Sequence, residues 1–73
     1  MTELEKLKHL IKHWMEHNDA HVKTYSEWAS KAESLGEKEL SGVLKQIAEE
    51  SGKLEALFKK ALENIQTTDV LSV

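Results

Sequence analysis

Apolar and aromatic residues recur at alternating intervals of three and four along the first half of the chain. The series is Leu4, Leu7, Ile11, Trp14, Tyr25, Trp28, Ala32 and Leu35, with Asn18 and His21 in the two places that complete it. Such heptad spacing puts all of these residues on one face of a helix. Because the spacing keeps its phase throughout, one long helix is predicted over about residues 3–34.

Both ends of this helix carry sequence signals. Thr2, followed three residues later by Glu5, forms a capping-box pattern in which the side chains bond to free backbone N–H groups. Gly36 suits the left-handed position that follows a helix C-terminus. Asn18 or Asp19 could cap a separate helix, but the unbroken phase favours a single one.

A second series with the same spacing follows the glycine: Leu40, Leu44, Ile47, Ser51, Leu54, Phe58, Ala61 and Ile65. It predicts a helix over about residues 38–66. Gly42 and Gly52 lie inside this helix, and each is up to about 1 kcal/mol less favourable there than alanine. A break near Gly52, which would give a three-helix bundle, therefore stays open as the alternative.

The predicted fold is all-α, an antiparallel two-long-helix hairpin, because a short connection makes neighbouring helices antiparallel. Residues 1–66 form a single helical-hairpin domain, and residues 67–73, which lack a helical period, are expected to form a flexible C-terminal tail. Further apolar residues widen both faces beyond what two helices can cover: Leu10, Met15, Val22, Ala29, Val43, Ala48, Leu57 and Leu62. A chain this small rarely buries enough surface alone. We therefore expect a homodimer, most simply two hairpins forming a four-helix bundle.

Composition excludes several classes of protein. The 73 residues include no Cys and no Pro, and Lys+Arg 10 against Asp+Glu 13 gives a formal net charge of −3. Without cysteine there is no disulfide framework, thiolate metal site or cysteine nucleophile. The basic residues are all lysines dispersed among acids, so nucleic acid is not expected as a partner. No apolar run suits a membrane helix or a signal peptide, so we expect a cytoplasmic protein with no membrane partner.

The histidines are the candidate functional residues, and they follow one another at intervals of four: His9, His13, His17 and His21. On a helix each lies about 40° around from the last. In the heptad register the stripe moves from the outer face at His9 to the flank of the core at His17 and into the core at His21. Histidines at i and i+4 can present two imidazoles to one ion, and imidazole is a good ligand for divalent Ni, Co, Cu or Zn.

His13, His17 and His21 are therefore the predicted ligands of a divalent transition metal, of the Ni, Co or Zn class. His17 and His21 alone leave the site incomplete, so the other ligands are expected from His13, from the same residues of a symmetry mate, or from an acid on the facing helix such as Glu50 or Glu55. The function predicted from this stripe is metal handling or sensing.

The same region has a structural alternative. In an antiparallel hairpin Asn18, His21 and Ser51 fall at one level, and a polar core layer of this kind can fix helix register and oligomeric state. The alternative function is a non-catalytic homo-oligomeric interaction module. An enzyme is less favoured, because no nucleophile, phosphate loop or carboxylate pair accompanies the histidines. Trp14 also takes the place of the acid that zinc peptidases need after the first histidine.

The segment HWMEHNDAHVKTYSEWA, residues 13–29, resembles a family of small uncharacterised helical proteins and domains from anaerobic bacteria and archaea. The resemblance rests on the motif HWxxHNxxH, followed by an aromatic residue and a Trp-Ala pair: His13, Trp14, His17, Asn18, His21, Tyr25, Trp28 and Ala29. Some members look to be associated with nickel or cobalt uptake systems. The resemblance therefore implies a transition-metal role for the three histidines, with a metal-uptake component as partner. His9 lies outside the motif.

Overall fold

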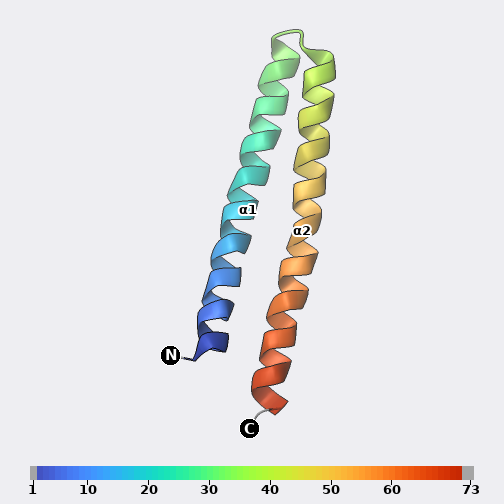
Figure 1. The fold of residues 1–73 in the computed structure, drawn as a ribbon. Coiled ribbons are helices and arrows are strands. Elements are labelled where there is room, and N and C mark those ends of the chain that lie inside the picture. The colour runs from blue at the N-terminus through green and yellow to red at the C-terminus, as the bar shows by residue number, and fades with distance from the viewer. Residues whose placement is uncertain (1, 72–73) are drawn as a thin grey trace.

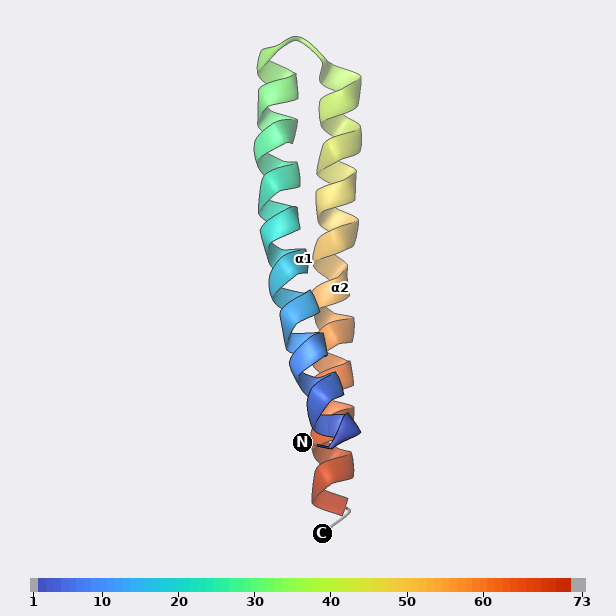
Figure 2. The same cartoon turned by 60° about the vertical axis from the view of Figure 1, so that its left-hand side comes forward.

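Two helices joined by a tight turn make up the fold. The computed structural model describes residues 2–71, with side chains described as far as Ile65. Helix α1 spans Glu3–Ser34 and helix α2 spans Lys38–Leu71, and the two run antiparallel (Figure 1). The helices stay beside each other in both views and wind gently around one another (Figure 2). The predicted all-α helical hairpin is confirmed.

The ends of α1 follow the predicted signals. The Thr2 hydroxyl oxygen accepts a hydrogen bond from the backbone N–H of Glu5 at 3.1 Å, which caps the helix. At the other end Gly36 has φ 83°, in the left-handed region that glycine adopts without strain. The N–H groups of Gly36 and Glu37 donate to the carbonyls of Glu33 and Ala32 at 3.0 and 2.9 Å, the Schellman arrangement.

Helix α2 is continuous through Gly52, so the three-helix alternative is not formed within residues 2–71. The helix also passes its expected end at residue 66 and continues to Leu71. The tail predicted for residues 67–73 thus overlaps α2 over residues 67–71, whose side chains, like residues 72–73 altogether, lie outside the described part of the chain.

The helices meet along a stripe that is rotated from the predicted one. On α1 the buried and half-buried residues of this stripe are Ile11, Met15, Asn18, Val22, Tyr25, Ala29 and Ala32. On α2 they are Ser41, Leu44, Ala48, Ser51, Glu55, Phe58, Leu62 and Ile65. Eight residues of the predicted series are retained: Ile11, Asn18, Tyr25 and Ala32 on α1 and Leu44, Ser51, Phe58 and Ile65 on α2. Trp14, His21, Trp28 and Ile47 are exposed, and the next residue along the chain takes the place of each.

Side-chain size gives a physical reason for this rotation. Ala29, Ser41 and Ala48 are buried between the helices, and small side chains let two helices approach closely. The tryptophan ring of Trp28, which the predicted series placed there, would hold the backbones apart. The predicted and the observed stripe both have heptad spacing, so spacing alone does not distinguish them. The packing of small side chains between the helices does.

The core of the single hairpin is small. Its buried apolar residues are Ile11, Ala29, Ala32, Ala48 and Ile65, and no large side chain is fully buried in the part of the chain whose side chains are described. The hairpin measures 58 × 18 × 11 Å, a slender shape with little interior. Neither helix, as far as it is described, has an apolar stretch long enough to cross a bilayer.

Candidate functional site

The histidine stripe lies on the exposed side of α1. All four histidines are exposed, and three of them form a series of neighbouring rings. The ring centroids of His13 and His17 are 4.4 Å apart, and those of His17 and His21 are 6.3 Å apart. The series ends on Tyr25, whose ring is stacked on His21 at 6.0 Å with 17° between the ring planes. The i, i+4 spacing of the helix accounts for this arrangement, because residues four apart lie over one another.

The predicted placement of His17 and His21 toward the core is wrong for the single hairpin. Val22 is half-buried in the position where His21 was expected, and both histidines are exposed. The rotated contact stripe is the reason. The closest imidazole pair is accordingly His13 and His17 rather than His17 and His21.

A polar contact between the helices does form at mid-length. The side-chain amide of Asn18 donates a hydrogen bond to the backbone carbonyl of Ser51 at 2.8 Å, in a partly buried setting. Of the three residues predicted to form a polar core layer, Asn18 and Ser51 therefore meet, whereas His21 is exposed. The Ser51 contact uses its backbone oxygen and not its hydroxyl.

A second contact of this kind was missed by sequence reasoning. The hydroxyl of Ser41, which is 2% exposed, donates a hydrogen bond to the backbone carbonyl of Ala29 at 2.8 Å. The signal was present in the sequence, because Ser41 and Ala29 are small residues placed where large ones would separate the helices. The predicted series instead placed Leu40, the preceding apolar residue, between the helices.

The single chain supplies imidazoles but not a complete metal site. Among the described residues no group of three or more His, Asp or Glu side chains is arranged to hold a metal ion. Glu55, suggested as a ligand from α2, is half-buried in the stripe between the helices. Glu50, the other suggested ligand, accepts a hydrogen bond from the Lys53 ammonium at 3.1 Å. This bond, and the negative charge of Glu50, raise the pKa of Lys53.

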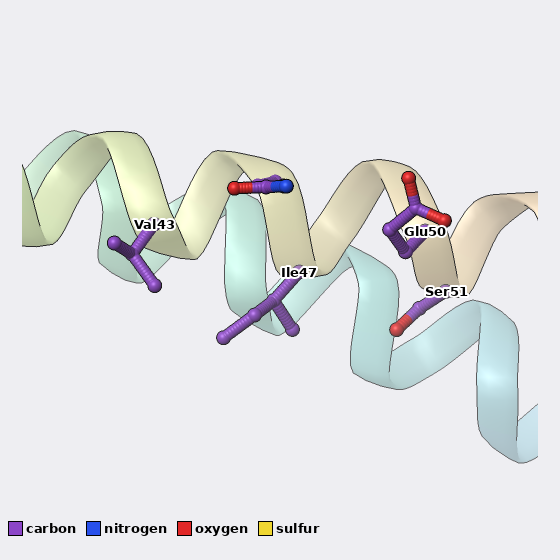
Figure 3. A pocket seen from close by; sticks show the side chains of 5 residues that line it. Val43, Ile47, Glu50 and Ser51 are labelled. Atoms are coloured by element: carbon purple, nitrogen blue, oxygen red, sulfur yellow. The ribbon is translucent and has the colours of Figure 1, made fainter.

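A shallow hollow of about 340 Å³ lies on α2 beside this glutamate. It is lined by Val43, Gln46, Ile47, Glu50 and Ser51. Figure 3 shows the side chains of Val43 and Ile47 pointing to the same side of α2. Since both are exposed aliphatic residues, the hollow offers apolar contact rather than groups for catalysis.

Comparison with known proteins finds similarity over most of the chain. Residues 7–65 match the model of a family described as a domain of unknown function (DUF8180). An uncharacterised protein of Archaeoglobus fulgidus is 40% identical over 62 residues, which cover 85% of this chain and 98% of that protein. No solved structure matches the chain. The residues matched by the family model include the histidines from 9 to 21, α1 from Leu7 onward and α2 as far as Ile65.

Proposed function

The chain belongs to the DUF8180 family, and we propose that it binds a divalent transition-metal ion of the Ni, Co or Zn class through His13, His17 and His21. One observation carries the proposal: the three imidazoles form a line on the exposed side of α1. No hydrogen bond engages these rings within the described part of the chain, so their nitrogens are free to bind an ion. The function would be metal handling or sensing.

The spacing of the rings supports chelation by neighbouring histidines. Two imidazoles on one ion have centroids roughly 5 Å apart, given metal–nitrogen distances of about 2.0–2.1 Å. The 4.4 Å between His13 and His17 needs only a small ring rotation, and the 6.3 Å between His17 and His21 a larger one. Because the side chains are exposed, neither rotation disturbs the packing between the helices.

The central histidine belongs to both neighbouring pairs. His17 should therefore contribute most to the affinity, whichever pair holds the ion. With no cysteine in the chain, the ligands are limited to nitrogen and oxygen, which suits the harder divalent ions and not soft-metal storage. Nickel and cobalt are the first ions to test, since the resemblance of the HWxxHNxxH motif implies them and an uptake system as partner.

Calorimetric titration of the untagged chain with Ni²⁺, Co²⁺ and Zn²⁺ tests the proposal. We expect His17→Ala to weaken binding by about tenfold or more, corresponding to about 1.4 kcal/mol, and His13→Ala or His21→Ala to weaken it less. His9→Ala is the matched control, because it removes an exposed histidine of the same helix that lies outside the series of rings. No binding tighter than about 1 mM for any of these ions would contradict the proposal.

A non-catalytic homo-oligomeric interaction module is the second candidate. The contact between Asn18 and Ser51 favours it, because a polar contact within an apolar stripe fixes the register of two helices. In this candidate the histidines have no ion to bind. The same titration separates the two functions, since an assembly module would show no effect of His17→Ala on any metal affinity.

A further inference from the structure

One broad side of the hairpin is apolar and uncovered. We call it the open face and define it by Leu7, Trp14 and Trp28 on α1 and Leu40, Ile47 and Leu54 on α2. All six are exposed, Trp14 at 46% and Trp28 at 54%. Each stands one position before a residue at or beside the stripe between the helices. Both helices are right-handed and they run antiparallel. A residue one position before the stripe therefore projects to the same broad side of the hairpin, whether it belongs to α1 or to α2.

Three more aliphatic residues extend the open face sideways, one helical turn from its defining residues. They are Leu10, Val43 and Leu57, exposed at 47%, 54% and 60%. The hollow beside Val43 and Ile47 lies in this area. The Lys31 ammonium lies 4.5 Å from the centroid of the Trp28 ring, and Glu50 lines the hollow. These two residues carry opposite charges and together give the face no net charge.

The opposite broad side has a different character. Residues one position after Ile11, Asn18, Tyr25, Ala32, Leu44 and Phe58 project there, and they are polar or charged: Lys12, Asp19, Ser26, Glu33, Lys45 and Lys59. All six are exposed. Among the side chains that the structure describes, only one side of the hairpin therefore has a reason to be covered, because large exposed apolar patches mark sites of association.

We propose that a second copy of this chain covers the open face, so that two hairpins form a dimer of four helices. The proposal concerns assembly and does not rest on metal binding. One copy has no fully buried large side chain among those described, and chains of this size usually need oligomerisation or another staple to be stable. A second copy supplies that missing interior.

The size of the open face matches what a stable dimer needs. The broad side of the hairpin that carries the open face measures 58 by 18 Å, so two copies in contact along its whole length would bury up to about 2,000 Å², the upper end of the range of about 1,200–2,000 Å² for specific interfaces. The open-face residues recur at intervals that are multiples of seven along both α1 and α2. Two copies can therefore interdigitate along their whole length, as helices do in a four-helix bundle.

The polar residue of the open face also suits a second copy. His21 stands one position before Val22, near mid-length of α1, between Trp14 and Trp28. A neutral imidazole has one donor and one acceptor nitrogen, so in a dimer without a bound ion two imidazoles can satisfy each other. In a two-fold contact a residue near the axis meets its own copy. An unrelated apolar partner would leave His21 without a polar group.

The experiment is the mass of the untagged 73-residue chain in solution, by sedimentation equilibrium with a chelator present so that no ion takes part. We expect twice the chain mass of 8.3 kDa at micromolar concentration. Ile47→Lys should raise the dimer dissociation constant by about 100-fold or more, because a charge would be buried at the centre of the contact. The matched control Ser26→Lys adds the same charge to the opposite side and should leave the dissociation constant unchanged.

A second measurement covers the case in which Ile47→Lys does not fold. Both tryptophans of the chain lie on the open face, so acrylamide quenching of the wild-type protein reports directly whether that face is covered. We expect strong protection, lost on dilution below the dissociation constant. A folded chain of 8.3 kDa with freely quenched tryptophans, or a dimer that Ile47→Lys weakens no more than Ser26→Lys does, would overturn the proposal.

Discussion

The side-chain amide of Asn18 donates a hydrogen bond to the backbone carbonyl of Ser51 at 2.8 Å, across the middle of the hairpin. Because the acceptor is a backbone atom, the two residues should respond differently to substitution. Asn18→Ala should lower the free energy of unfolding by about 1 kcal/mol, the usual net value of one such bond. Ser51→Ala keeps the acceptor and should change it by less than about 0.5 kcal/mol. Urea unfolding of both variants checks this, and equal losses would contradict it.

Buried Ser41 should tolerate little extra volume. Its hydroxyl donates to the carbonyl of Ala29 between the helices, so Ser41→Leu must push the backbones apart. Overpacking of this kind costs about 1–3 kcal/mol of unfolding free energy. Ser30→Leu, at an exposed position of α1, is the control and should change it by less than about 0.5 kcal/mol. A neutral Ser41→Leu in urea unfolding would mean that the helices are not in close contact there.

Two glycines should respond to alanine with opposite signs. At Gly36, φ is 83°, so Gly36→Ala should cost about 1–2 kcal/mol because a Cβ strains the left-handed conformation. Gly42 lies inside α2, and a Cβ there would meet nothing within 4 Å. Gly42→Ala should therefore stabilise the protein by up to about 1 kcal/mol. The thermal midpoints of the two variants measure both effects, and shifts of the same sign would contradict the assigned turn.

Binding of an ion to the folded histidine stripe should raise stability. At a free ion concentration about 100 times the dissociation constant, mass action adds about 2.7 kcal/mol to the free energy of unfolding. The gain should disappear with excess chelator and fall to about 1.4 kcal/mol or less in His17→Ala at the same ion concentration. His9→Ala should keep it. Thermal unfolding with and without Ni²⁺ measures these gains, and an equal gain in His17→Ala would place the ion elsewhere.

The helix ends and the hairpin could be predicted from single residues. Thr2 and Gly36 carry local signals for the ends of α1, and their hydrogen bonds and φ angle confirm them. The end of α2 at Leu71 could not be predicted in this way, because residues 67–73 have no capping residue or period that separates helix from tail.

The contact stripe shows why the site was predicted less well than the fold. Two overlapping heptad series share Ile11, Asn18 and Tyr25. Between these shared residues, one series has Trp14, His21 and Trp28, and the other has Met15, Val22 and Ala29. Periodicity alone does not choose between them, since both rows lie on one apolar side of the helix. Packing of small residues across the pair decides the choice. The sequence offered one hint. Of the two α1 series, the one with His21 would bury a histidine as well as Asn18, whereas the one with Val22 buries Asn18 alone among amide and charged residues.

The position of the turn at one end of the hairpin also affects the order in which the contacts between the helices form during folding. The bond between Ser41 and Ala29 closes a separation of 12 residues, and that between Asn18 and Ser51 a separation of 33. Closing a short loop loses less chain entropy than closing a long one, so we expect the hairpin to zip from Gly36 outward and to fray from its free ends. His9, His13 and His17 occupy the half of α1 nearer those ends, and His21 lies just past its midpoint. Brief openings would therefore reach the stripe of imidazoles long before they reach the turn.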